Sequence, residues 1–169
     1  MVFPWGRGLV KRSAGLLMYR QRGQEPEVLL VHPGGPFWRN KDSHCWSIPK
    51  GEPGPGEPDE AAAAREFEEE TGFTPSGVFL PLGETVQASG KHVVAFAVEG
   101  EIDPDRIVSV TCEVEWPPKS GKRITVPEVD RAGWFTLSAA HDKIIKGQEV
   151  FLGRLAKILS RGPETPGRS

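Results

Sequence analysis

Three glutamates with helical spacing are the residues of this sequence best suited to chemistry. Glu66, Glu69 and Glu70 stand at positions i, i+3 and i+4, so in an α-helix their side chains share one face. Like charges on one face repel each other and weaken an isolated helix. A hard divalent cation relieves that repulsion, because Mg²⁺ and Mn²⁺ bind carboxylate oxygens. The spacing therefore indicates a metal site.

The residues around these glutamates indicate the helix that must position them. Pro58 suits a first helical turn, where its missing N–H costs nothing, and four consecutive alanines follow shortly after it. Gly72 can adopt the left-handed conformation that ends a helix. We therefore expect a helix over residues 58–71. Ala63 and Phe67 are expected to lie on the side away from the glutamates and to pack into a core.

The segment 51–73 resembles the Nudix box: a Gly, five residues, a Glu, seven residues, then Arg-Glu-apolar-x-Glu-Glu-x-Gly-apolar. Every specified position is filled, by Gly51, Glu57, Arg65, Glu66, Phe67, Glu69, Glu70, Gly72 and Phe73. The many constrained positions in one short segment make this resemblance specific. The alternative interpretation, a solvated acidic helix after a flexible loop, does not account for the upstream Gly and Glu.

The resemblance implies a Mg²⁺ or Mn²⁺ cofactor held by the clustered acids and one backbone carbonyl. Its expected ligands are Glu66, Glu69, Glu70 and the carbonyl of Gly51 or Lys50. Arg65 is expected to orient a neighbouring glutamate, and Glu57 to lie nearby as a helper in metal binding. Either Glu66 or Glu69 is also a candidate base for the attacking water.

The base can also lie outside the box in Nudix enzymes. Glu128 is the first candidate, because it precedes Trp134 by a spacing similar to that of a loop acid in several relatives. Glu115, beside Trp116, is the second candidate. The alternative interpretation for either residue is an ordinary surface carboxylate.

The sequence before the box carries the signals for the substrate. Residues 46–51, Trp-Ser-Ile-Pro-Lys-Gly, resemble the W-x-x-P-K-G segment of dinucleoside polyphosphate and diphosphoinositol polyphosphate hydrolases. Lys50 offers a point charge to a phosphate chain. Lys50, Trp46 and Trp116 are the predicted substrate-binding residues. An aromatic side chain can stack on a base, and core packing is the alternative role.

The rest of the chain indicates an α+β domain, because strand patterns surround the acidic helix without the regular alternation of a doubly wound sheet. Helical periodicity returns at 144–159. The resemblance implies an α/β/α sandwich with a mixed central sheet over residues 13–159, with the box as loop–helix–loop. Residues 1–12 are interpreted as a lead-in and 160–169 as a disordered tail. The expected strands are 13–19, 27–31, 45–49, 78–82, 84–88, 91–98, 110–116 and 134–137.

Composition limits the other possibilities. The 169 residues suffice for one domain, and the net charge of −2 argues against a general binder of nucleic acids or membrane surfaces. No stretch approaches the ~20 apolar residues of a membrane helix, and the N-terminus lacks the apolar run of a signal peptide. Cys45 and Cys112 form no zinc motif or disulfide framework. We expect a cytoplasmic protein, monomeric or homodimeric.

These observations lead to a metal-dependent pyrophosphohydrolase that cleaves a nucleoside polyphosphate. A dinucleoside polyphosphate such as diadenosine tetraphosphate is the first candidate substrate. One alternative is a housekeeping or sanitising hydrolase of nucleoside triphosphates or sugar nucleotides. Another is a non-catalytic, nucleotide-binding Nudix-like regulator. Such regulators often lack box glutamates, and this sequence has all of them, which favours the enzyme.

Overall fold

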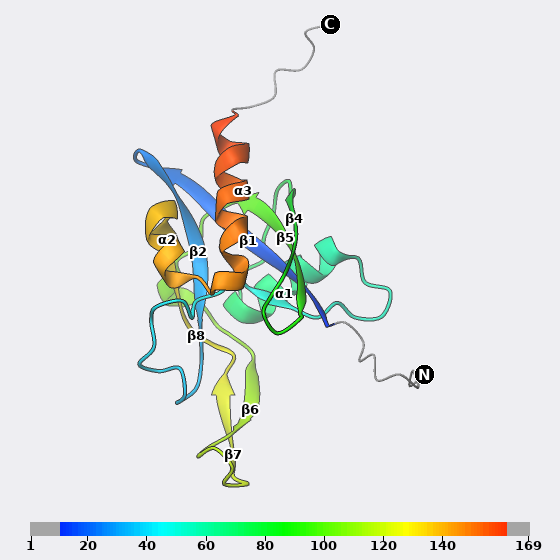
Figure 1. The fold of residues 1–169 in the computed structure, drawn as a ribbon, viewed down its shortest axis with the longest axis vertical. Helices are drawn as coiled ribbons and strands as arrows, with labels where there is room; N and C mark the ends of the chain where they lie inside the picture. Colours follow the sequence, from blue (N-terminus) through cyan, green and yellow to red (C-terminus); the bar gives the residue numbers. More distant parts are fainter. Residues whose placement is uncertain (1–10, 162–169) are drawn as a thin grey trace, which may run out of the picture.

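A mixed β-sheet forms the centre of the computed structural model, which describes residues 11–161 (Figure 1). Its strands are β1 (Arg12–Arg22), β2 (Glu25–Pro33), β3 (Lys50–Gly51), β4 (Leu80–Val86), β5 (His92–Glu99) and β8 (Val129–Thr136). They are arranged in the order β4-β5-β1-β2-β8, with β3 paired to β1. Strands β1 and β5 run parallel, and the other neighbours run antiparallel.

Helices cover both faces of this sheet. Helix α1 (Asp59–Thr71) packs on one face, whereas α2 (Leu137–Lys143) and α3 (Glu149–Ser160) pack on the other (Figure 1). Two short 3₁₀ helices, η1 (Pro104–Arg106) and η2 (Lys146–Gln148), lie in the connections. The predicted α/β/α sandwich with a mixed central sheet is therefore confirmed.

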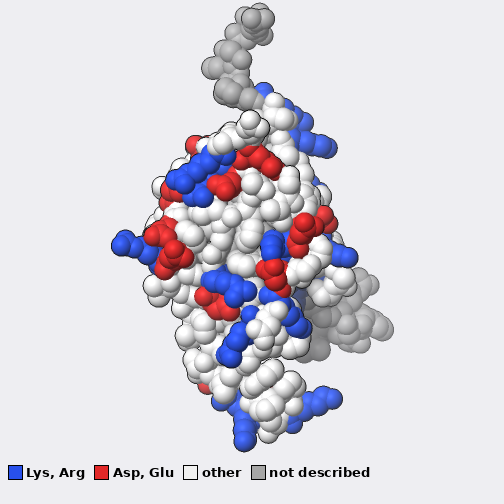
Figure 2. All heavy atoms as spheres, turned by 90° about the vertical axis from the view of Figure 1, so that its left-hand side faces the viewer, with Lys and Arg blue, Asp and Glu red and all other residues white. Residues whose placement is uncertain are grey.

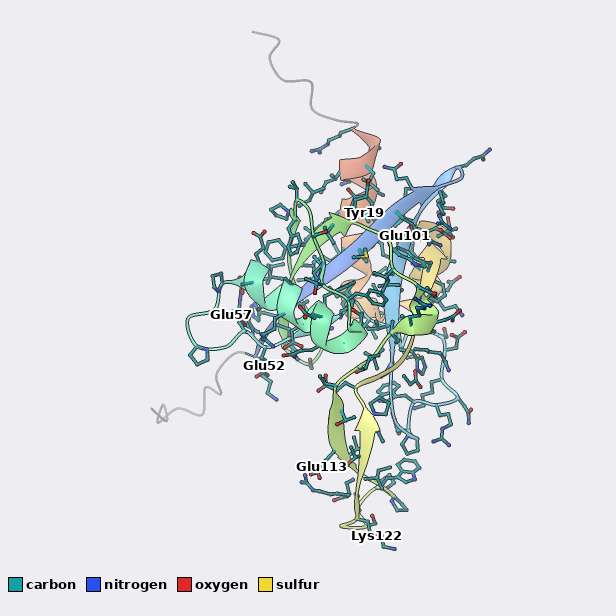
Figure 3. All side chains as sticks on the ribbon, turned by 180° about the vertical axis from the view of Figure 1, so that it is seen from behind. Tyr19, Glu52, Glu57, Glu101, Glu113 and Lys122 are labelled. Carbon is teal, nitrogen blue, oxygen red and sulfur yellow. The ribbon has the colours of Figure 1, made fainter. Side chains whose placement is uncertain are left out.

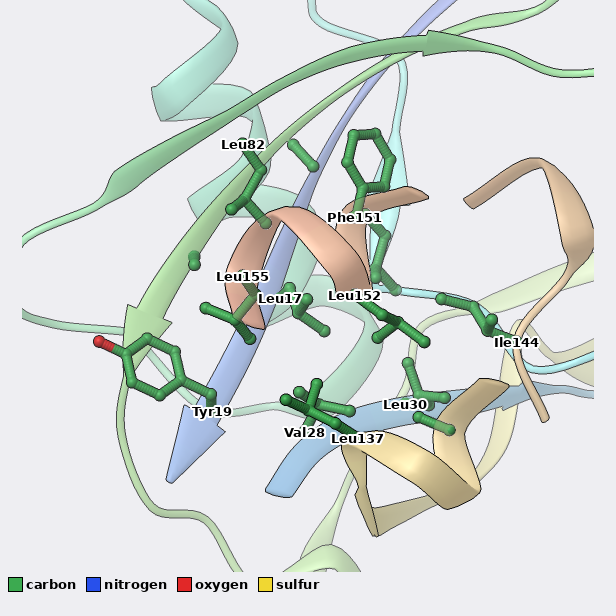
Figure 4. Packing of buried hydrophobic residues seen from close by; sticks show 14 of the residues in the cluster. Leu17, Tyr19, Val28, Leu30, Leu82, Leu137, Ile144, Phe151, Leu152 and Leu155 are labelled. Atoms are coloured by element: carbon green, nitrogen blue, oxygen red, sulfur yellow. The ribbon is translucent and has the colours of Figure 1, made fainter. Parts of the chain in front are cut away.

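Strand β1 separates two hydrophobic cores. Its residues 13–19 are all buried, as expected for a central strand that is covered on both faces. Side chains alternate between the faces: Leu16 joins the core beneath α1, and Leu17 joins the core beneath α3. Figure 4 shows Leu152 and Leu155 of α3 packed around Leu17.

A two-stranded hairpin extends from the body of the protein. It consists of β6 (Thr111–Glu115) and β7 (Arg123–Pro127), so the strand predicted at 110–116 is confirmed. Figure 3 shows Glu113 and Lys122 on this hairpin, remote from Glu57. Basic side chains gather at the same end in Figure 2, whereas acidic and basic groups are mixed over the rest of that face.

Several predicted elements have different boundaries in the structure. The strand predicted at 134–137 stops at Thr136, because the Thr136 hydroxyl accepts the N–H of Ala139 and caps α2. Residues 45–49 form only isolated bridges. The break expected at Gly83 is a bulge within the single strand β4. Of the helical segment predicted at 144–159, α3 begins only at Glu149.

Helix α3 also covers the edge of the sheet at β4. Nη1 of Arg154 donates hydrogen bonds to the carbonyls of Leu82 (2.9 Å) and Glu84 (3.0 Å). Between them, Gly83 has a φ of 78°, and a Cβ built there would lie 3.1 Å from Nη1 of Arg154. Glycine therefore permits both the bulge and the approach of the guanidinium.

The predicted lead-in and tail lie outside the described residues, apart from their inner ends. Arg12 already belongs to β1 and Ser160 to α3. Within residues 11–161, no helix is long and apolar enough to cross a membrane. Cys45 and Cys112 are free cysteines, which agrees with the expectation that they form no disulfide.

Candidate active site

Helix α1 has a defined start and a defined end. The carbonyl of Pro58 accepts the N–H of Ala62 at 3.0 Å. Asp59 in the first turn receives two hydrogen bonds from Arg12 of β1, at 2.6 and 3.2 Å. Gly72, at a φ of 81°, ends the helix. The helix predicted from the sequence is therefore present, and an ion pair ties its first turn to the central strand.

Strand β3 brings the backbone of Gly51 against helix α1. Gly51 pairs with Ala14 and Lys50 with Gly15 of β1. A Cβ built at Gly51 would lie 2.1 Å from Cδ of Glu66 and within 2.3 Å of both carboxylate oxygens. Only a glycine leaves room there for the carboxylate.

Arg65 holds the acids of the box together. It donates to Glu57 through Nε (3.0 Å) and Nη2 (2.9 Å), and its Nη1 donates to Glu66 (2.9 Å) and Glu69 (3.0 Å). Nη2 also reaches the carbonyl of Glu52 at 3.0 Å, and Figure 3 shows Glu52 and Glu57 in the loop before α1. The hydrogen bonds from Arg65, with a further one from the backbone, lower the pKa of Glu57 to about 2. The expected orienting role of Arg65 fits this geometry.

The three helical glutamates have different environments. Glu66 and Glu70 are buried, with 8% and 9% of their surface exposed, and they share the inward side of α1 with Phe67. The side chain of Glu69 remains 39% exposed. The expectation that Ala63 and Phe67 lie on the side away from the glutamates is therefore wrong for Glu66 and Glu70, which are buried on the same side of α1.

Glu70 lacks a full set of partners in this buried position. Among the described residues, its Oε2 atom is buried without any hydrogen-bond partner. Burial raises the pKa of Glu70 to about 8, against the opposing effect of the Lys50 charge. Burial also raises the pKa of Glu66 and lowers that of Lys50. The site thus concentrates carboxylates where water does not solvate them.

A small cleft opens beside Glu70. It has a volume of about 170 Å³ and is lined by Val31, Pro33, Cys45, Ser47, Ile48, Lys50, Glu70, Glu128 and Val129. Glu128, the first candidate for an acid outside the box, therefore lies beside Glu70 and Lys50. Glu128 keeps an exposed surface, and its partial desolvation at the cleft, together with the charge of Glu69, raises its pKa. Glu115 is exposed on the hairpin, away from this cleft.

The donor set fits a hard divalent cation. Glu70 has an unpartnered buried oxygen. The backbone of Gly51 lies directly beside the Glu66 carboxylate, because no side chain separates them. Oxygen atoms of this kind are the preferred ligands of Mg²⁺ and Mn²⁺. No group of three His, Cys, Asp or Glu side chains within residues 11–161 is already arranged around a common centre. Arg65 binds Glu66 and Glu69 in this arrangement.

The two predicted substrate-binding tryptophans lie elsewhere. Trp46 is buried in the core beneath α2 and α3, where its ring contacts His32 and Phe135 edge-on. Its Nε1 donates to Asp42 at 2.9 Å. Contrary to expectation, it offers no face to a substrate. Trp116 lies in the hairpin loop, where its N–H binds the carbonyl of Lys122, and its role stays a prediction.

Cys45 and Ser47 are among the six cleft residues that were not predicted from the sequence. Both contribute to the wall of the cleft, although neither belongs to a recognisable motif. Their proximity to the predicted residues Trp46 and Lys50 in the chain is the only available signal. Ser47 and its neighbour Ile48 both line the cleft, and Cys45 reaches it from the same core cluster in which Trp46 is buried.

Comparisons with known proteins agree with this geometry. The model of the NUDIX domain family matches residues 9–155, which is most of the chain. An asymmetrical bis(5'-nucleosyl)-tetraphosphatase from Caenorhabditis elegans is 38% identical over 66 residues. That match covers 39% of this chain and 44% of the relative, so it spans less than half of that protein.

Solved structures share the fold over almost the whole chain. The binary complex of a C. elegans Ap4A hydrolase superposes with a TM-score of 0.64 at 21% identity, covering 88% of this chain and 98% of that one. The NUDIX domain of Shewanella oneidensis NrtR, in complex with ADP ribose, gives a TM-score of 0.61 at 15% identity and covers 94% of each chain. Identities this low establish a common fold alone.

Proposed function

The chain belongs to the NUDIX domain family, and we propose that it is a divalent-metal-dependent pyrophosphohydrolase acting on a nucleoside polyphosphate. The observation that carries the proposal is the buried carboxylate of Glu70, with an unpartnered oxygen close to Glu66 and Glu128. Burying such charges without compensation is unfavourable. A divalent cation held by these carboxylates would compensate their charge.

The residues of the box divide the work. Glu66, Glu69, Glu70 and the carbonyl of Gly51 would hold the cation. When bound, it would neutralise phosphate charge and lower the pKa of a water. Arg65 orients Glu66 and Glu69, and Glu57 in turn fixes Arg65. Catalysis in such a site consists mainly of positioning and electrostatic stabilisation.

Glu128 is proposed as the general base. It lies in the cleft next to Glu70, and its raised pKa brings its basicity nearer to neutral pH, which favours proton abstraction from water. Glu66 and Glu69 are weaker candidates, because both already accept hydrogen bonds from Arg65. A carboxylate with free lone pairs is better placed to accept a proton.

A dinucleoside polyphosphate such as diadenosine tetraphosphate is the proposed substrate. The C. elegans relative that shares 38% identity over part of the chain carries the name of a tetraphosphatase for such compounds. Lys50 adds support, because it lines the cleft beside Glu70 and its charge suits a phosphate chain. These two observations favour long phosphate chains over single triphosphates.

A substrate panel tests the proposal. Purified protein is assayed with Mg²⁺, Mn²⁺ or excess chelator against diadenosine tetraphosphate, nucleoside triphosphates, sugar nucleotides and diphosphoinositol polyphosphates. We expect hydrolysis only with metal, and highest kcat/KM for the tetraphosphate. A triphosphate preferred by more than about tenfold, or ~1.4 kcal/mol, would overturn the substrate ranking. Full activity in chelator would overturn the metal site, and nucleotide binding without turnover would indicate a regulator.

A further inference from the structure

The segment between Trp46 and Gly51 changes its pairing partners within a few residues. Ser47 exchanges both backbone hydrogen bonds with Val31 of β2, at 2.9 and 3.0 Å. Further on, Lys50 and Gly51 pair with β1. The carbonyl of Pro49 also binds β1, where it accepts the N–H of Leu16 at 3.0 Å. Pro49 has no N–H. The N–H of Ile48 is therefore the backbone donor left between the two pairings, in a residue with no exposed surface.

Gln148 of η2 supplies the missing partner. Its Oε1 accepts the N–H of Ile48 at 3.0 Å and lies 3.2 Å from the hydroxyl of Ser47. Its Nε2 donates to the same hydroxyl at 3.0 Å. Gln148 is fully buried, so water does not compete for these bonds. A buried N–H deprived of its acceptor is costly, which makes this side chain a substitute for a strand.

The 3₁₀ helix that carries Gln148 is itself fixed. The N–H of Gln148 donates to the carbonyl of Ile145 at 3.0 Å, and the N–H of Ile145 donates to the carbonyl of Trp46 at 2.8 Å. Next to Gln148, a Cβ on Gly147 would lie 2.9 Å from Cγ of Gln87. The amide therefore acts from a rigid support that packs closely against the turn after β4.

The held segment leads directly to the proposed site. A Cβ on Gly15 would lie 2.5 Å from Cδ1 of Ile48, and one on Gly51 would lie 2.1 Å from Cδ of Glu66. Lys50 lies between Ile48 and Gly51 in the chain and lines the cleft with Glu70. With clearances this small, a shift of the segment changes the position of Lys50 and Gly51 relative to the carboxylates.

We propose that Gln148 is a positioning residue, which fixes Ile48 and thereby sets Lys50 and Gly51 at the metal and phosphate site. The inference rests on the proposed function for its catalytic consequence, but its structural part concerns Ile48 alone. It assigns a role to the C-terminal part of the domain, far in sequence from the box. Gln148 acts through the backbone and does not itself touch the reacting groups.

The test compares three variants of the full chain. Gln148→Met keeps the size of the side chain but removes the acceptor, whereas Gln148→Glu keeps an oxygen for the Ile48 N–H. Leu155→Ala truncates a buried residue of α3 and controls for general loss of stability. The readouts are amide hydrogen exchange at Ile48, Mn²⁺ affinity from the electron paramagnetic resonance signal of free Mn²⁺, and the kinetic constants kcat and KM.

We expect Gln148→Met to accelerate exchange at Ile48 by about tenfold or more. We also expect it to weaken Mn²⁺ binding by about tenfold and to lower kcat/KM by at least as much, with Gln148→Glu recovering most of each loss. Leu155→Ala should leave Mn²⁺ affinity unchanged. The inference is overturned if Gln148→Met behaves like Leu155→Ala in exchange and Mn²⁺ affinity. A wild-type protein that neither binds Mn²⁺ nor hydrolyses nucleotides refutes the proposed function, and exchange at Ile48 still decides whether Gln148 fixes this segment.

Discussion

Replacing Glu70 by glutamine isolates the cost of burying its charge. The pKa of Glu70 in the folded, metal-free protein is about 8, against an ordinary value of 4.5. A carboxyl group whose pKa is raised by folding stabilises the protein below the unfolded pKa, and that stabilisation is lost as the pH rises through the folded pKa. At up to 1.36 kcal/mol per pH unit, the ionisation of Glu70 lowers the free energy of unfolding by roughly 3.5 kcal/mol between about pH 5 and pH 8.

The Glu70→Gln variant should lose this dependence. Its free energy of unfolding, measured by urea denaturation in chelator, should fall by roughly 3.5 kcal/mol less than that of the wild type over the same pH range. Glu68→Gln removes the same charge from an exposed position of the same helix and should resemble the wild type. An unchanged pH slope in Glu70→Gln would refute the burial argument, and a variant that unfolds without metal would show Glu70 to be structural.

Metal should reverse the order of stability. Mg²⁺ binding requires the ionised carboxylate, so the wild type should gain stability with added Mg²⁺, increasingly so at higher pH. Glu70→Gln should gain much less, and its turnover should fall by at least ~100-fold, or roughly 2.7 kcal/mol of transition-state stabilisation. Full turnover in this variant would show that Glu70 is not a ligand.

Three further substitutions extend the test. Gly51→Ala places a Cβ 2.1 Å from Cδ of Glu66 and should reduce turnover and Mn²⁺ affinity by at least about tenfold. Gly54→Ala is the control and should stay active, because its Cβ would lie 3.9 Å from Oε1 of Glu57, an ordinary contact distance. Glu128→Gln should lower kcat by about 10²-fold or more. Because a general base acts when ionised, the wild-type rate should fall as the pH drops through the raised pKa of Glu128. A variant whose rate falls over the same pH range would exclude Glu128 as the general base. Asp59→Asn breaks the pair with Arg12, which lowers the pKa of Asp59, so its stabilisation is present above the unfolded pKa and lost as the pH falls through the folded one. In urea denaturation the cost should be below ~1 kcal/mol at pH 7 and absent near pH 2; equal costs at both would exclude the ion pair.

The local part of the site follows from the sequence, because helix geometry is local. The start of α1 near Pro58 and its end at Gly72 were both predicted and are both present. The orientation of the glutamates was predicted less well. At about 100° per residue, Glu70 lies only about 60° from Phe67 around the helix, so a buried Phe67 brings Glu70 inward with it. Glu70 was predicted to lie opposite Phe67, whereas its angular position brings it to the buried side of α1, at the cleft.

Contacts between distant segments could not be predicted from the pattern. Trp46 resembles a site residue because it begins the segment before the box, yet it packs beneath α2 against Phe135. Gln148 has no motif at all, and its partner Ile48 lies a hundred residues away in the chain. Such pairs form only after the sheet and the C-terminal helices assemble, so no short window of sequence contains them.

The guanidinium of Arg154 also affects how the protein behaves towards other copies of itself. An outermost strand normally presents free carbonyls that can recruit a strand from another molecule, which is a common route to aggregation. Arg154 occupies two of these carbonyls on β4, and the bulge at Gly83 disturbs the regular spacing that an incoming strand needs. The residue that docks α3 therefore also protects this margin of the sheet against unwanted extension. A single side chain thus serves both intramolecular packing and colloidal stability.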